Sequence, residues 1–240
     1  IVVHNYGVPA YMEKIMQLAK KYKVPVIEDA AEAWGASIKG KPCGTVGDIG
    51  VFSFNSNKTV TAFGGGLLTT SNSRWVTRAR LLAAQARLPK PYYVFDEVGY
   101  NYRMSPLTAA YGLLQMEQDA LSVGNRQRVF ANYCKQLSTI PGLSWAQELE
   151  GHVASRWLSA FRFSKSKSVK EFLKSADNQG IEIRIGWNPL HRMQHLSGFP
   201  KFLNGTSEKL FREILCLPSN ILSERTVEGL IKSTKVTKCQ

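Results

Sequence analysis

The chain has 240 residues, enough for one large domain or two smaller ones, and its 44% hydrophobic and 20% charged residues are typical of a soluble globular protein. Its apolar runs are far shorter than the about 20 residues that span a bilayer, so we expect no membrane segment, and its first residues lack the pattern of a secretory signal. The net charge of +13 permits a nucleic-acid partner, but no helix-turn-helix, zinc-finger or aromatic RNA-binding motif accompanies it, so a solvated basic surface that attracts an anionic substrate is favoured.

The first part of the chain predicts buried strands joined by a helix and by glycine turns. We expect a helix over residues 11–22, where apolar side chains recur at helical spacing, and a short apolar strand over residues 24–29. A helix that leads into a fully buried strand favours a parallel sheet covered on both faces. Further strands are predicted at residues 49–54 and 67–70, so several strand ends meet at one edge, where α/β sheets bind ligands.

The next part predicts two helices and then a change of character. Residues 74–87 show an amphipathic helical pattern, and Ser105, followed by a proline, begins another helix. Beyond about residue 120, strand-like and helix-like segments alternate in a more basic sequence with fewer glycines. We therefore predict an α/β fold, with one domain over residues 1–120 and a smaller α+β domain over residues 121–240.

The cysteines are dispersed and give no metal-binding pattern. None of them forms a C-x-x-C pair, and they stand at Cys43, Cys134, Cys216 and Cys239. We therefore expect no metal site and interpret them as reduced cysteines of a cytoplasmic protein.

Lys58 lies on a turn directly after the predicted strand at residues 49–54. A lysine in a partly desolvated pocket has a lowered pKa, and its neutral amine can attack a carbonyl. The structural alternative is an exposed lysine on a surface turn. Gly64, Gly65 and Gly66 follow, and they either let the backbone approach a flat ligand closely or form a plain tight turn.

Asp29 ends the predicted strand at residues 24–29. A carboxylate in this place needs a cation or hydrogen-bond donors, and it could also cap a helix that begins at Ala30. An aspartate that holds a pyridinium nitrogen, a hydroxyl that meets a phosphate, a lysine that carries an aldehyde and a glycine-rich return are the parts that pyridoxal 5'-phosphate (PLP) requires.

Two stretches carry a family resemblance: EDAAEAWGASIKGKPCGTVGDIGVFSFNSNKTVTAFGGGLLTT, residues 28–70, and DEVGYNYRMSPLTAAYGLLQMEQ, residues 96–118. They resemble the DegT/StrS-type nucleotide-sugar aminotransferases, which are fold type I PLP enzymes. The likeness is continuous over residues 1 to about 120 and looser beyond, where it rests on GWNPLHR and CLPSN. It implies the later part of the family's large domain, with a mixed, mostly parallel sheet and helices, followed by the small domain. By this resemblance we expect the first third or more of a family member to be missing.

The resemblance implies a role for each of five residues. Lys58 would form the Schiff base and shuttle protons, and Asp29 would pair with the pyridine nitrogen. Glu32 would lie near the ring hydroxyl, and Ser53 would donate to the phosphate. Asn101 would reach the phosphate of the neighbouring subunit's cofactor, which implies a homodimer with shared active sites.

The resemblance also implies a reaction. Dehydratase relatives carry a histidine where this chain has Lys58, so transamination is favoured. The stretches ARLPKPYYVFDEVGYNYRM and FNSNK look most like members that aminate 4-keto-6-deoxy sugars on UDP, with L-glutamate as the amino donor, for the biosynthesis of amino sugars and cell-surface glycans. The alternative is a truncated, catalytically incompetent relative that acts as an assembly or regulatory partner.

Other residues are candidate contacts with two interpretations each. His4 is either a structural histidine or a substrate contact. His191 and Arg192 belong to a loop that approaches the sugar nucleotide in relatives, and Trp187 could stack there or pack in the core. Arg103 could pack a dimer interface or meet an anionic group.

Overall fold

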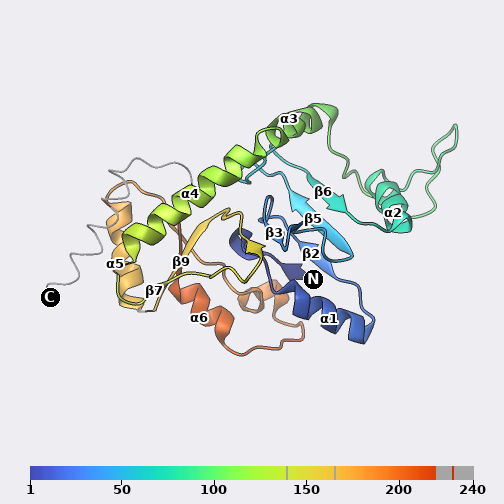
Figure 1. Cartoon of the computed structure of the whole chain (residues 1–240). Coiled ribbons are helices and arrows are strands. Elements are labelled where there is room, and N and C mark those ends of the chain that lie inside the picture. The colour runs from blue at the N-terminus through green and yellow to red at the C-terminus, as the bar shows by residue number, and fades with distance from the viewer. Residues whose placement is uncertain (139, 165, 220–228, 230–240) are drawn as a thin grey trace. The chain divides into compact units, whose positions relative to one another are not determined.

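The computed structural model describes residues 1–138, 140–164, 166–219 and 229. The chain forms two compact units. Figure 1 shows the whole chain, coloured from the N-terminus to the C-terminus. The first contains residues 1–124 and 148–157, and the second contains residues 125–147 and those from 158 onward. The division differs from the predicted boundary at 120/121 because residues 148–157 return to the first unit. Cys239 lies outside the described residues.

The first unit is built on a four-stranded sheet in which parallel pairs predominate. Its strands lie in the order β1 (Val2–Val3), β2 (Ile27–Asp29), β5 (Ile49–Ser53) and β6 (Gly66–Thr69). β2 pairs in parallel with both β1 and β5, whereas β6 runs antiparallel to β5. The mixed, mostly parallel sheet of the prediction is therefore confirmed. The second strand is shorter than expected, because Val24 still bonds back to Ala19 at the end of the preceding helix.

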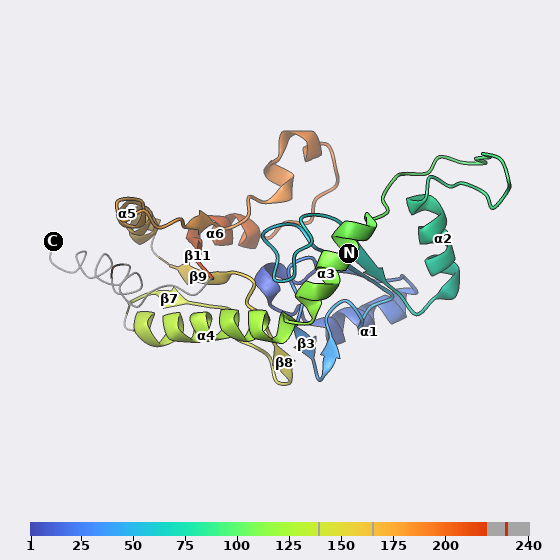
Figure 2. The ribbon, with the colours of Figure 1, turned by 90° about the horizontal axis from the view of Figure 1, so that it is seen from above.

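Four helices contribute to the first unit. They are α1 (Met12–Tyr22), α2 (Ser73–Ala83), α3 (Pro106–Met116) and the beginning of α4 (Asp119–Leu137). Ser105 caps α3, since its hydroxyl accepts a hydrogen bond from the backbone N–H of Thr108 (3.1 Å). The connection between α2 and α3 extends away from the sheet as a long arm (Figure 2).

A small second sheet attaches the returning segment to the first unit. β3 (Ser37–Ile38) pairs antiparallel with β4 (Lys41–Pro42) and with β8 (His152–Val153). Lys39 and Gly40 form the β3–β4 turn, and both have a positive φ. Residues 148–157 thus pack beside a hairpin more than 100 positions earlier in the sequence.

The second unit is an α+β arrangement around an antiparallel sheet. Its strands lie in the order β10 (Arg184–Ile185), β11 (Ile214–Leu217), β9 (Ser159–Phe163) and β7 (Leu143–Ser144). α5 (Ser166–Asp177), α6 (Thr206–Glu213), the 3₁₀ turns η2 (Leu190–Arg192) and η3 (Gln194–Leu196) and the later part of α4 complete it. Tyr133, Phe161 and Leu215 are almost completely buried in its core. Over the ranges that the structure describes, no helix is long and apolar enough to cross a bilayer.

Candidate active site

Lys58 lies on a turn beyond the carboxyl end of β5, and its amine is enclosed by two other side chains. The turn is closed by a hydrogen bond from the Lys58 N–H to the Asn55 carbonyl (3.0 Å). The Lys58 Nζ lies 4.0 Å from the Trp157 ring centroid and 4.0 Å from the Glu32 Oε1. Only 14% of the Lys58 side chain is exposed, so the alternative of an exposed surface lysine is wrong.

Burial lowers the pKa of the Lys58 amine below its ordinary value. The carboxylates of Glu32 and Asp29 act in the opposite direction, because each favours the charged ammonium, but the cost of burial exceeds their attraction. The amine therefore has a larger neutral fraction near pH 7 than an exposed lysine. A neutral amine is the form that attacks a carbonyl.

Asp29 is the last residue of β2 and belongs to the same edge of the sheet. Its Oδ1 accepts a hydrogen bond from the backbone N–H of Ala31 (3.1 Å), which forms a turn and not a helix. The alternative that Asp29 caps a helix beginning at Ala30 is therefore wrong. The Asp29 carboxylate raises the pKa of the Lys58 amine, because its negative charge favours the ammonium.

Glu32 follows in this turn, and the backbone of Tyr6 holds its carboxylate. Its Oε2 accepts a hydrogen bond from the backbone N–H of Tyr6 (2.7 Å), which leaves Oε1 toward Lys58. Ser53, the last residue of β5, accepts a hydrogen bond from the Asn55 N–H (3.3 Å). The carboxyl ends of the adjacent strands β2 and β5 thus present Asp29 and Ser53 at one edge.

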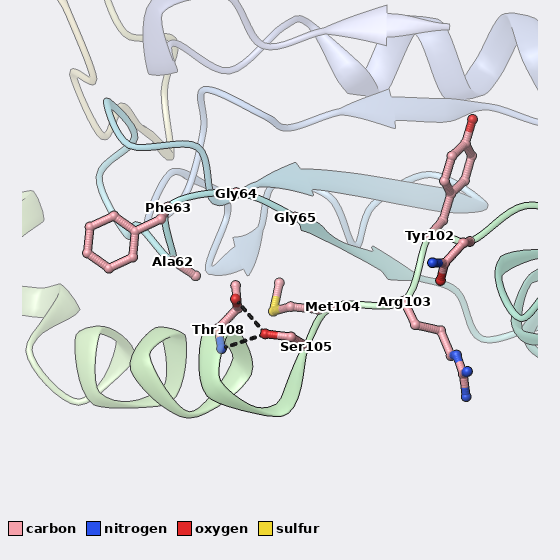
Figure 3. A pocket seen from close by; sticks show the side chains of 10 residues that line it. Ala62, Phe63, Gly64, Gly65, Tyr102, Arg103, Met104, Ser105 and Thr108 are labelled. Carbon is pink, nitrogen blue, oxygen red and sulfur yellow. Dashed lines mark hydrogen bonds between the residues drawn. The ribbon is translucent and has the colours of Figure 1, made fainter.

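Asn101 lies elsewhere in the first unit, on a pocket of about 490 Å³. Figure 3 shows this pocket, with the glycine turn above the Met104 side chain, Ser105 bonded to Thr108, and Arg103 extending away from them. The lining residues are Ala62–Gly65, Asn101–Ser105 and Thr108, a set that does not include Lys58. The structure therefore brings Glu32 to the Lys58 amine, with Asp29 and Ser53 at the ends of adjacent strands, and places Asn101 on a pocket whose lining does not include Lys58.

Two of the three glycines after Lys58, Gly65 and Gly66, pack closely against other parts of the chain, whereas a Cβ on Gly64 would meet nothing within 4 Å. Gly65 has a φ of +79°, and a Cβ there would lie 2.5 Å from the Met104 Cε. A Cβ on Gly66 would lie 2.5 Å from the Phe52 carbonyl oxygen. Side chains at these positions would therefore collide with the pocket wall and with β5.

His4 is a structural residue, and its assignment as a substrate contact is corrected. Its side chain is completely buried. The Nδ1 accepts a hydrogen bond from the Ala10 N–H (3.0 Å), so the Nε2 carries the proton that it donates to the Glu28 Oε2 (2.8 Å). Both ring nitrogens are occupied, and no face of His4 is accessible to a substrate.

The other predicted substrate residues belong to the second unit. The His191 Nε2 pairs with the Glu208 Oε1 (2.7 Å), and the Arg192 guanidinium lies 5.3 Å from the ring centroid of Phe211. Trp187 is exposed. Their contact with a substrate stays a prediction.

Sequence reasoning missed Trp157, which covers the Lys58 amine. The indole N–H also donates to the Asn57 carbonyl (2.8 Å), so Trp157 contacts both the turn and the side chain of the candidate lysine. These contacts join positions about 100 residues apart. No local pattern signals such a contact, because it depends on how residues 148–157 return to the first unit.

The comparisons with known proteins agree on one family. Residues 1–233 match the DegT/DnrJ/EryC1/StrS aminotransferase family. EpsN of Bacillus subtilis, provisionally named a pyridoxal phosphate-dependent aminotransferase, is 38% identical over 91% of this chain and 58% of its own length. The GDP-perosamine synthase of Caulobacter vibrioides is 36% identical over 80% of this chain and 52% of its own length.

A solved structure agrees with these sequence relatives. The aminotransferase TlmJ from Streptoalloteichus hindustanus superposes with a TM-score of 0.90 at 27% identity, over 98% of this chain and 64% of that one. The chain thus spans little more than half the length of the curated relatives that it matches.

Proposed function

Because the chain belongs to the DegT/DnrJ/EryC1/StrS aminotransferase family, we propose that it forms the lysine-bearing part of a PLP-dependent aminotransferase that acts on a keto sugar linked to a nucleotide. One observation carries this proposal. The amine of Lys58 is nearly enclosed at the carboxyl edge of a mostly parallel sheet, between the Trp157 ring and the Glu32 carboxylate, with its pKa lowered by burial.

The chemistry of these residues fits PLP. The cofactor needs an amine for its aldehyde, a carboxylate for its ring nitrogen and donors for its phosphate, and Lys58, Asp29 and Ser53 provide these groups at the ends of two adjacent strands. When bound, PLP supplies an electron sink that stabilises negative charge on a substrate carbon.

The residues of the chain then have distinct tasks. Lys58 would hold the cofactor through its amine and would carry the proton during transamination, a task suited to an amine whose pKa lies below that of a free lysine. Asp29 would keep the ring nitrogen protonated, and Ser53 would donate to the phosphate. Glu32 lies beside the amine, where it would meet the ring hydroxyl.

The substrate and the partner subunit are finer parts of the proposal. We propose a 4-keto-6-deoxy sugar on UDP as acceptor and L-glutamate as donor, in amino-sugar and cell-surface glycan biosynthesis. Since one relative is a GDP-perosamine synthase, the assay compares UDP- and GDP-linked keto sugars with glutamate as donor. In a homodimer, Asn101 would reach the partner's cofactor from the pocket that it lines together with the glycine turn after Lys58.

Cofactor attachment tests the proposal directly. The purified chain is incubated with PLP, reduced with borohydride, digested and analysed by mass spectrometry. We expect the adduct on the peptide that contains Lys58 and its loss in Lys58→Arg, which keeps the positive charge but removes the nucleophilic amine. The matched control is Lys90→Arg, an exposed lysine on the arm, which should leave the adduct unchanged.

Two other results have clear meanings. An adduct that persists in Lys58→Arg, or that spreads over exposed lysines, contradicts the proposal. Specific attachment at Lys58 without amino transfer to any UDP- or GDP-linked keto sugar would favour the alternative of a catalytically incompetent relative.

A further inference from the structure

Trp157 makes two separate contacts with the segment that carries Lys58. The face of its ring lies over the amine, with the Lys58 Nζ 4.0 Å from the ring centroid. The edge of the ring bonds to the backbone, because the indole N–H donates to the Asn57 carbonyl (2.8 Å). One side chain therefore contacts both the reactive group and the turn from which that group projects.

The backbone around Trp157 is fixed by contacts that do not involve Lys58. The Ser155 N–H donates to the Gly7 carbonyl (2.9 Å), and the Lys39 N–H donates to the Gly151 carbonyl (2.6 Å). β8 adds its pairing with β3. The ring is thus positioned by the returning segment, and the amine lies against a surface that is already in place.

The indole ring affects the amine in two opposite ways. It shields the amine from water, which disfavours the ammonium. Its electron-rich face attracts the ammonium, and tryptophan gives the strongest such attraction among the aromatic side chains. Glu32 and Asp29 are the charged groups that face the amine, and both also favour the ammonium. The ring therefore holds the resting amine in a defined place between the indole face and the Glu32 carboxylate.

We propose that Trp157 is a positioning residue for Lys58, in which the indole N–H fixes the turn and the ring face holds the ammonium in its resting orientation. This inference deepens the proposed function and rests on it, since the orientation matters only if Lys58 attaches the cofactor. The contact between Trp157 and Lys58 exists without the cofactor, so it can be measured in the cofactor-free chain.

A matched pair of variants separates the two contacts. Trp157→Phe keeps an aromatic face and loses the N–H, whereas Trp157→Leu loses both and has a similar size to phenylalanine. Competitive acylation of the cofactor-free chain over a range of pH, read by mass spectrometry, gives the titration midpoint of Lys58, with exposed Lys90 as an internal reference. Hydrogen exchange of residues 55–60 reports on the turn.

We expect a lower Lys58 midpoint in Trp157→Leu than in Trp157→Phe, because only the leucine variant loses the attraction for the ammonium. Below the midpoint, loss of a cation–π contact raises the neutral fraction of the amine about 2-fold to 30-fold. Exchange at residues 55–60 should accelerate in both variants, since both lose the bond to Asn57. Equal midpoints in the two variants, or unchanged exchange in both, would overturn the proposal.

A second measurement remains if neither variant folds. Lys58→Met keeps Trp157 and removes the cation. In chain labelled with 5-fluorotryptophan, the Trp157 resonance should titrate with the acylation midpoint of Lys58 and lose this titration in Lys58→Met. A Trp157 resonance that changes neither with pH nor in Lys58→Met would refute the contact between Trp157 and Lys58.

The outcomes distinguish this inference from the proposed function. Acylation, exchange and fluorine signals require no cofactor, so they test the contact between Trp157 and Lys58 alone. If they behave as expected while PLP fails to attach to Lys58, the proposed function fails and the physical contact stands. If PLP attaches to Lys58 and the variants match the unmodified chain, only the role of Trp157 fails.

Discussion

The completely buried carboxylate of Glu28 accepts hydrogen bonds from four groups. The His4 Nε2 donates one (2.8 Å), and the backbone N–H groups of Gly44, Val46 and Gly47 donate the others (2.9, 2.7 and 2.5 Å). Burial raises the pKa of Glu28, but the bonds from His4, Gly47 and Gly44 together outweigh it, so the net pKa lies below the ordinary 4.5. The charged carboxylate thereby ties β1 and β2 to the loop before β5.

Glu28→Gln should destabilise the chain at neutral pH by about 2–5 kcal/mol, because the amide NH₂ would face donors that now meet an oxygen. A depressed carboxyl pKa gives stability that is present above 4.5 and is lost as the pH falls through the folded-state value. The difference in unfolding free energy between the two proteins should therefore narrow below pH 4.5. Urea unfolding of both proteins at several pH values measures this difference in unfolding free energy.

An exposed carboxylate provides a matched control. Glu150 is exposed, so Glu150→Gln should leave the unfolding free energy nearly unchanged at every pH. A Glu28→Gln difference that stays constant from neutral pH to pH 3 would contradict the link between the lowered pKa and stability.

At the scale of secondary-structure elements, a side chain sets the start of α2 and backbone contacts set its end. α2 begins where Asn72 accepts hydrogen bonds from the Arg74 N–H (3.0 Å) and the Trp75 N–H (3.4 Å). The helix was predicted over residues 74–87 but ends at Ala83. The carbonyls of Leu82 and Ala83 accept hydrogen bonds from the backbone N–H groups of Tyr100 and Tyr102, where the arm comes back to the helix. The helix therefore ends where the chain begins to pair with the arm.

Asn72→Ala should lower the unfolding free energy by about 1 kcal/mol, because two N–H groups at the start of α2 lose their acceptor. Asn72→Asp should retain the stability, since its carboxylate accepts the same bonds and suits the positive end of the helix dipole. Thermal unfolding followed by circular dichroism measures both. An alanine variant as stable as the aspartate variant would show that Asn72 does not act as the cap.

At the scale of the whole molecule, the return of residues 148–157 completes the first unit. Gly7 lies where this segment meets the strand ends, with a φ of +81°. A Cβ there would lie 2.5 Å from the Ser155 Oγ, 2.8 Å from the Trp157 N and 2.9 Å from the Glu32 carbonyl oxygen. The close approach of these backbones therefore requires glycine.

Gly7→Ala should lower the unfolding free energy by about 2–5 kcal/mol, the sum of left-handed backbone strain and overpacking. Gly40→Ala is the matched control, because Gly40 also has a positive φ (+78°) but a Cβ there meets nothing within 4 Å. It should lose only the strain, about 1–2 kcal/mol. Denaturant unfolding gives both values, and hydrogen exchange over residues 148–157 should accelerate in Gly7→Ala alone.

Equal losses in the two glycine variants would show that backbone strain is the whole effect. Unchanged exchange over residues 148–157 in Gly7→Ala would mean that the returning segment does not depend on its close packing at Gly7.

The sequence by itself determined the local features of this protein. The helices at residues 12–22 and 106–116, the parallel pairing in the sheet and the places of Asp29 and Lys58 after apolar strands follow from apolar periodicity, from turn residues and from side chains at strand ends. These signals depend on neighbours within a few positions, so one chain suffices to recognise them.

Only the tertiary structure decided the environment of these residues. The sequence could not distinguish a structural His4 from a substrate contact, because the answer depends on the buried carboxylate 24 positions later. Nor could it assign Trp157 to Lys58, since about 100 residues separate this side chain from the turn that it contacts. Burial, and with it the pKa of an amine, depends on all the groups that surround it in space, and long-range folding alone brings those groups together.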